Sequence, residues 1–275
     1  QAFEEGPEFE VSCRIEAVEP RAENLHPVNE SARHSAEIAL ARRKFEHIDR
    51  GEKLFLVQTL LREHNRMQQE GLNRVSPHFI PMMIANIASA NVAAMVHAEG
   101  PNLPVVTACA TGTHAVGEAY RIVREGRADV MICGGAEAAI TDRSIAGFAN
   151  SKALSVSDDP AAASLPFDKR RKGFVMGEGA GIMVLEEYES AVKRGAKILC
   201  EIAGYGANSD AYHITAPRGD GSGARECMRL AINDAGLSLG DIKYINAHGT
   251  STSLNDKGES IAIAELFGEN TSDVY

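Results

Sequence analysis

Apolar and polar positions alternate along the last two thirds of the chain as a succession of strand-like runs and helix-like stretches. The runs rich in β-branched residues are LPVVTA (103–108), ADVMICGG (128–135), GAGIMVLEE (179–187), KILCEIAGYG (197–206) and IKYINAHG (242–249). Apolar residues near i, i+3 and i+4 spacing predict helices over Gly112–Glu125, Tyr188–Arg194, Gly223–Ala235 and Asp256–Phe267. This alternation predicts an α/β layered fold, and because the strands are so apolar we expect both faces of the sheet to be covered.

The first part of the chain has a different pattern. Residues 1–74 form a charged, mainly helical segment, in which Asn29–Gln69 contains a single glycine and predicts two surface helices. The stretch Phe79–Val96 is uncharged, but Pro81 and several small polar residues interrupt it. We therefore expect a buried helix after Pro81 rather than a membrane span.

Composition narrows the classes of partner. The chain has 275 residues and a formal net charge of −10, which argues against nucleic acid or an anionic membrane as the main partner. The five cysteines have no C-x-x-C pairing, so we expect no metal site and a reducing, cytoplasmic location. They are Cys13, Cys109, Cys133, Cys200 and Cys227.

Cys109 occupies the point at which an apolar strand gives way to small residues and then to a helix. The start of a helix favours a thiolate over a thiol. The small residues around Cys109, such as Gly112, leave room for a substrate carbonyl to approach free backbone N–H groups, which is the geometry of acyl transfer. The simpler interpretation is a small buried residue at a strand end, as most free cysteines are.

His248 has an equivalent place in the stretch YINAHGTSTSLNDKGE, 244–259. An imidazole on such a turn can donate a hydrogen bond to a developing enolate or move a proton, and Thr250, Ser251 and Thr252 add hydroxyls for a polar ligand arm. A lone histidine is more often structural. A cysteine turn and a histidine turn on repeated β-turn-α units together favour catalysis.

The stretch DKRRKGFVMGEGAGIMVLEE, 168–187, is rich in glycine but lacks the order of a phosphate loop, so it is a weak nucleotide signal. Its glycines are compatible with close backbone packing beneath a site, with Phe174 as an apolar wall. Residues 169–172 are basic and form either a rim or a solvated loop.

These motifs together resemble the β-ketoacyl-acyl carrier protein synthases, particularly the type II elongating enzymes of bacterial fatty acid synthesis. The similar stretches include GPNLPVVTACATGTHAVGEA, GRADVMICGGAEAAI, GFANSKALS, GYGANSDAYHITAP and INAHGTSTSLNDKGE, in the family's order. The resemblance implies a thiolase-like αβαβα fold, incomplete in this chain, and a homodimer. Residues 75–200 would be the rest of the N-terminal half and 201–275 the start of the C-terminal half.

The resemblance also implies roles for individual residues. Cys109 would accept an acyl chain as a thioester, and His248 would support decarboxylation of malonyl-acyl carrier protein before Claisen attack. No cofactor is implied, because the phosphopantetheine arrives on the carrier protein. Glu259 would match an acid that pairs with a lysine. The residues expected along the pantetheine arm and the acyl site are Thr250, Thr252, Thr215, Phe148 and Phe174.

The expected partner is acyl carrier protein, which is acidic in this pathway. Against a net charge of −10, docking would need a local basic patch. The candidates are Lys152, Lys169, Arg170, Arg171 and Lys172.

The sequence departs from the family in several places. The family's second catalytic histidine and its preceding lysine have no match, and Ser253 stands where the family commonly has proline. We therefore expect a fragment or a faulty gene model. The alternatives are a non-catalytic or truncated ketosynthase-like chain and a thiolase-type coenzyme A acyltransferase.

Overall fold

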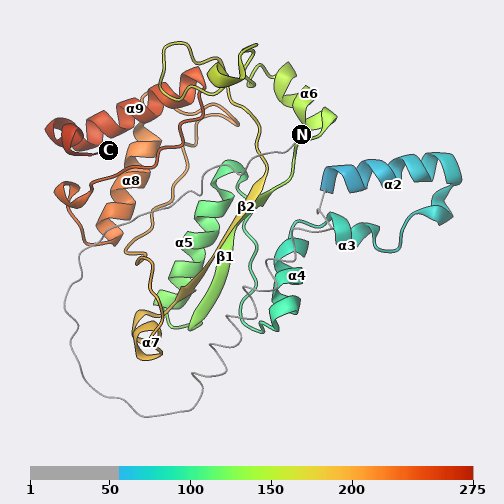
Figure 1. Cartoon of the computed structure of the whole chain (residues 1–275), viewed down its shortest axis with the longest axis horizontal. Helices are drawn as coiled ribbons and strands as arrows, with labels where there is room; N and C mark the ends of the chain where they lie inside the picture. The colour runs from blue at the N-terminus through green and yellow to red at the C-terminus, as the bar shows by residue number, and fades with distance from the viewer. Residues whose placement is uncertain (1–55, 275) are drawn as a thin grey trace.

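A computed structural model of the chain describes residues 56–274, which form a mixed α/β structure (Figure 1). Two antiparallel strands, β1 (Val130–Glu137) and β2 (Gly179–Glu186), pair along their whole length. The register runs from Val130 opposite Glu186 to Glu137 opposite Gly179. Both strands were predicted from their apolar runs, and both are confirmed.

Helix α5 (Thr111–Arg124) packs against the strand pair. Its Ala119 and Ile122 are buried, and its last turn carries Arg121 and Arg124, where cations complement the helix dipole. Glycines allow the close approach, because a Cβ at Gly135 would lie 3.1 Å from the Cα of Gly112.

We expected both faces of the sheet to be covered by other segments. This prediction is wrong for the described residues. Consecutive residues of β2, Ile182, Met183 and Val184, are 46%, 44% and 38% exposed. The apolar character of a strand predicts burial, but which segment covers it depends on contacts distant in sequence.

The other predicted helices are present, with ends displaced by at most a few residues. They are α7 (Tyr188–Lys193), α8 (Ser222–Asp234) and α9 (Ser253–Phe267), and α6 (Asp142–Asn150) follows β1. Helices α8 and α9 pack together, joined by an ion pair between Arg225 and Glu265 (Figure 1). Short 3-10 turns span Leu72–Arg74, Ala108–Ala110, Pro160–Ala162, Leu239–Asp241 and Gly268–Asp273.

Three of the predicted strands, 103–108, 197–206 and 242–249, are not strands among the described residues. Alternating apolar residues predict extended backbone, but a strand also needs a ladder partner, which the local pattern does not specify. The segment around Tyr205 instead packs between helices. A Cβ at Gly117 of α5 would overlap the Tyr205 ring, and the N–H of Tyr205 donates to Asp234 of α8.

The prediction of a buried helix within Phe79–Val96 is also wrong. The chain forms α3 (Phe79–Met83) and α4 (Ile87–Val96), separated where Ile84 becomes extended, and neither has a buried residue. Pro81 lies in the first turn of α3, where its missing N–H costs no helical bond.

Of the two surface helices predicted within Asn29–Gln69, α2 (Leu56–Glu70) is the described part. The rest lies outside the described residues. Over 56–274, no helix is both long and apolar enough to cross a membrane.

Candidate active site

Cys109 lies exposed on the short turn Ala108–Ala110 that leads into α5. Ala108 has a φ of 50°, a left-handed conformation that is strained for a residue with a Cβ. Local hydrogen bonds close the turn, because the N–H of Thr107 donates to Thr111 Oγ1 at 2.9 Å and the N–H of Ala110 donates to the Thr107 carbonyl at 3.1 Å. The predicted turn before a helix is confirmed, but the strand expected to lead into it is not present over residues 56–274.

The other described thiols have different surroundings. Cys133 on β1 is buried, and burial raises the pKa of its thiol to about 11. Burial also raises the pKa of Cys227, whose Sγ donates to the Gly206 carbonyl. Cys200 is exposed but lies outside any helix-start turn. Cys109 is therefore the exposed thiol that the fold places at the start of a long helix.

His248 is exposed on a turn whose backbone is fixed by Glu259 of α9. The N–H of His248 donates to Glu259 Oε1 at 2.6 Å, and the N–H of Gly249 donates to Oε2 at 2.9 Å. Asn255 Nδ2 donates to the same carboxylate at 3.3 Å. Glu259 thus holds the histidine turn through its backbone. Its pairing with a lysine stays a prediction.

The hydroxyls after His248 face each other. Thr250 Oγ1 and Thr252 Oγ1 lie 2.8 Å apart, and Thr252 precedes the first residue of α9. Between them, Ser251 is fully buried with a φ of 65°, a left-handed conformation that persists only where the surroundings impose it.

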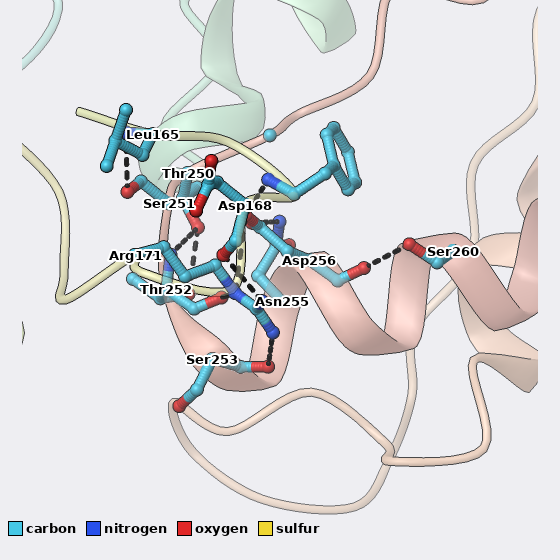
Figure 2. A network of polar contacts seen from close by, with 12 residues as sticks. Leu165, Asp168, Arg171, Thr250, Ser251, Thr252, Ser253, Asn255, Asp256 and Ser260 are labelled. Carbon is cyan, nitrogen blue, oxygen red and sulfur yellow. Dashed lines mark hydrogen bonds and ion pairs between the residues drawn. The ribbon is translucent and has the colours of Figure 1, made fainter. Parts of the chain in front are cut away.

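A segment from much earlier in the chain, 165–173, supplies those surroundings (Figure 2). The N–H of Leu165 donates to Ser251 Oγ at 3.0 Å, and the N–H of Gly173 donates to the Ser251 carbonyl at 3.0 Å. Asp256, which is 1% exposed, accepts from the N–H of Phe167 at 2.8 Å. We call residues 165–173 the brace.

The brace leads along the chain into the strand pair against which α5 packs. Gly112, three residues after Cys109, packs on Gly135 near the end of β1, and this end of β1 pairs with the first residues of β2. The brace ends at Gly173, shortly before β2 begins at Gly179. In the described part of the chain, Cys109 and His248 share no hydrogen bond.

The predicted apolar site residues divide into a pair and a single residue. Phe148 of α6 and Phe174 meet edge to face, with ring centroids 5.2 Å apart, and Phe174 follows the brace directly. Thr215 lies apart on an exposed loop, where its N–H donates to His213 Nδ1 at 3.1 Å. The structure joins Phe148 to Phe174 but gives Thr215 no hydrogen bond or ring contact with either.

The predicted basic rim is not uniform. Lys152, Lys169 and Lys172 are exposed. Arg170 pairs with Asp168 at 2.8 Å, and this guanidinium holds the pKa of the carboxyl well below its usual range. Arg171 is only 19% exposed and directs its guanidinium inward, so its part in the rim stays a prediction.

Sequence reasoning did not anticipate the roles of Asn255 and Asp256. A carboxylate in the first turn of a helix is common at a surface, because it complements the helix dipole. The burial of Asp256 depends on contacts distant in sequence, such as the bond from the N–H of Phe167, 89 residues earlier, and the local sequence does not predict them.

The chain is similar to known proteins of one family. The model of the β-ketoacyl synthase N-terminal domain matches residues 8–191, and the model of the C-terminal domain matches residues 199–275. A 3-oxoacyl-[acyl-carrier-protein] synthase 2 from Staphylococcus aureus is 53% identical over 206 residues, which are 75% of this chain and 51% of that protein. The synthase of the same name from Synechocystis sp. is 55% identical over 206 residues, 74% of this chain and 50% of that protein.

Solved structures are similar as well. A β-ketoacyl synthase from Burkholderia phymatum has a TM-score of 0.71 and 40% identity, covering 76% of this chain and 51% of that one. A type II polyketide ketosynthase solved with its acyl carrier protein has a TM-score of 0.74 and 36% identity, covering 78% of this chain and 54% of that one. The chain spans about half the length of the curated relatives it matches. With both domain models matched in order, this chain belongs to the β-ketoacyl synthase family.

Proposed function

We propose that the protein carrying this chain is a 3-oxoacyl-acyl carrier protein synthase that elongates fatty acyl chains. The observation that carries the proposal is the pair of turns, the exposed Cys109 before α5 and the exposed His248 before α9. The activity named for the curated relatives from Staphylococcus aureus and Synechocystis supports it.

The proposed reaction has two transfers. The Cys109 thiolate attacks the carbonyl of an acyl-carrier thioester, the C–S bond breaks, and the pantetheine leaves as a thiolate that takes a proton from solvent. Malonyl-carrier protein then loses CO₂ to give an enolate, whose oxygen accepts a hydrogen bond from His248. The enolate carbon attacks the Cys109 thioester, which forms the new C–C bond and releases the cysteine. These steps need neither a metal ion nor a nucleotide.

The remaining site residues support binding. Thr250 and Thr252 present adjacent hydroxyls, 2.8 Å apart, to the amides of a pantetheine arm. Phe148 and Phe174 form an apolar wall for the acyl chain. The role of Thr215 along the site is proposed from the family resemblance alone. Glu259 keeps the His248 backbone in place through two N–H bonds and would pair with a lysine elsewhere in the protein.

The wider proposal covers the assembly. The protein is a cytoplasmic homodimer with a thiolase-like αβαβα fold, in which 75–200 belong to the N-terminal half and 201–275 to the C-terminal half. Acyl carrier protein docks on the exposed side chains of Lys152, Lys169, Arg170 and Lys172 through charge complementarity, whereas the inward-pointing Arg171 lies beneath this surface. Charge reversal at exposed Lys152 and Lys169 should weaken the salt dependence of carrier-protein binding. An unchanged salt dependence would show that the carrier protein does not dock on these residues.

The test uses the full-length protein and Cys109→Ala. The variant should accept no acyl group from acyl-carrier protein, as measured by intact mass, because no other described thiol is both exposed and at the start of a long helix. Cys200→Ala removes an exposed thiol outside that turn and serves as the matched control. Undiminished loading of Cys109→Ala would contradict the assignment.

The same assay distinguishes the alternatives. A thiolase-type enzyme would prefer coenzyme A esters to carrier-protein thioesters. A non-catalytic chain would give no condensation product even when Cys109 is loaded. Condensation with a preference for carrier-bound substrates supports the synthase.

A further inference from the structure

Arg171 differs from the other basic residues of the predicted rim in the direction of its side chain. Its side chain is 19% exposed, whereas that of neighbouring Arg170 is 73% exposed. Figure 2 shows the Arg171 side chain reaching from the brace to the turn that begins α9. A residue that serves only to attract an acidic partner would keep its charge in solvent.

The contacts of Arg171 use the whole planar group. Nε donates to the Thr252 carbonyl at 3.1 Å, Nη1 to the Asp168 carbonyl at 3.0 Å and Nη2 to the Ser253 carbonyl at 3.1 Å. An ammonium is a single point charge and cannot reproduce donors fixed in a fork. The arrangement therefore requires arginine, and not only a positive charge.

The charge of Arg171 also has a buried partner. Nε lies 3.6 Å from Asp256 Oδ2, and Asp256 is 1% exposed. The same carboxylate oxygen accepts from the Phe167 N–H. Arg171, Asp256 and the brace backbone thus hold the two sides of the Thr250–Ser253 turn together.

We infer that Arg171 is a positioning residue, which fixes the Thr250 and Thr252 hydroxyls for the pantetheine arm of the malonyl substrate. This inference rests on the proposed function. Arg171 acts through the Thr252 and Ser253 backbone and touches no reacting atom. In the described part of the chain Arg171 holds the turn that follows His248 and shares no hydrogen bond with the Thr107–Thr111 turn, so its loss should slow decarboxylation, which also needs His248, more than acyl loading, which uses only the pantetheine contacts.

The experiment measures the two half-reactions separately in the full-length protein, each with carrier-free substrates and, for comparison, with carrier-bound ones. Acyl transfer to Cys109 is followed from acyl-pantetheine by intact mass, and decarboxylation is followed from malonyl-pantetheine by release of CO₂. Arg171→Gln should slow decarboxylation by about 100-fold, and Arg171→Lys by about 10-fold, as misplaced binding groups do. Acyl-pantetheine would meet the same hydroxyls, so acyl loading should fall as well, but by no more than about fivefold for either variant.

Arg229→Gln removes the same charge from an exposed pair with Glu226 on α8 and is the matched control. It should change neither half-reaction. A normal decarboxylation rate in Arg171→Lys, or a defect in Arg171→Gln that appears only with carrier-bound substrate, would assign the residue to docking and overturn the inference. Equal losses in loading and decarboxylation would show general destabilisation and overturn it as well. Failure of the proposed function would look different, because the wild-type protein itself would then perform neither half-reaction.

Discussion

The turn that carries Cys109 is held by its immediate neighbours, whereas the turn that carries His248 is held by Glu259 of α9 and by a segment 78 to 89 residues earlier in the chain. The first is exposed, and its closing bonds lie within residues 107–111. The second contains the fully buried Ser251 and is followed by the nearly buried Asp256. Both contain a residue in the left-handed region, Ala108 or Ser251, so similar local geometry is imposed by different means.

This difference separates two ways of placing a reactive group. A local turn needs little beyond its own sequence, and a nucleophile on it stays accessible. In the proposed reaction the histidine turn presents hydroxyls and an imidazole together, and the long-range polar bonds fix the backbone of the residues that follow His248. We therefore expect damage to the brace to reduce stability and malonyl chemistry, and damage to the cysteine turn to reduce loading.

The largest effect is expected from Asp256→Ala, which removes the carboxylate shared by Phe167 and Arg171. Loss of one partner from a buried pair leaves the other charge uncompensated and costs about 3–5 kcal/mol. Urea unfolding of the full-length protein should show the midpoint moving to lower concentration, with the transition slope unchanged.

Asp256→Asn is the conservative comparison, since its amide oxygen still accepts from the Phe167 N–H, and its loss should be smaller. The exposed Asp241→Ala, at a short turn distant from the brace in sequence, tests for a general effect of removing a carboxylate. Equal midpoints for Asp256→Ala and Asp241→Ala would mean that the brace does not stabilise the protein.

A smaller effect, confined to the other turn, is expected from Thr111→Val. The substitution removes the Oγ1 that accepts from the Thr107 N–H, a bond worth about 1 kcal/mol. A displaced cysteine should load acyl groups about tenfold more slowly, while decarboxylation of malonyl-pantetheine stays unchanged. This is the reverse of the pattern expected for Arg171.

Thr111→Ser keeps the acceptor and should retain most of the loading rate. A loss of decarboxylation in Thr111→Val equal to its loss of loading would show that the two turns are not independent. Intact-mass time courses and CO₂ release measure both quantities on the same preparations.

The same division explains how far the sequence could predict the structure. Helices α5, α7, α8 and α9 follow from periodic apolar residues, and the cysteine turn follows from small residues between a strand-like run and a helix. These are properties of neighbouring residues. The three extended runs that form no ladder depend on partners elsewhere in the chain, so their apolar alternation predicted strands that the described residues do not show.

The candidate site divides in the same way. Cys109, His248 and the threonines were found from their local motifs. The inward direction of Arg171 was not, because a run of basic residues in sequence is typical of a solvated loop. Its acceptors, the carbonyls of Thr252 and Ser253, are backbone atoms that any residue would provide. Side-chain chemistry in the sequence therefore carried no signal of this contact.

The smallest effect is expected from Ala108→Gly, which tests whether the cysteine turn stores backbone strain. The left-handed conformation of an alanine costs about 1–2 kcal/mol of folding free energy, which glycine avoids. Glycine also has more conformational freedom in the unfolded chain, which destabilises the folded state by about 0.5–1 kcal/mol. The variant should thus be as stable as the wild type or more stable by about 1 kcal/mol, measured by urea unfolding.

Ala94→Gly, at an exposed position within α4, is the matched control and should lose about 1 kcal/mol, because its backbone is helical. If the two variants lost equal stability, the turn would hold no strain at Ala108. If Ala108→Gly is neutral or more stable but loads acyl groups more slowly, the strained backbone serves to aim the thiol, and the protein gives up stability at the cysteine turn that it recovers at the brace.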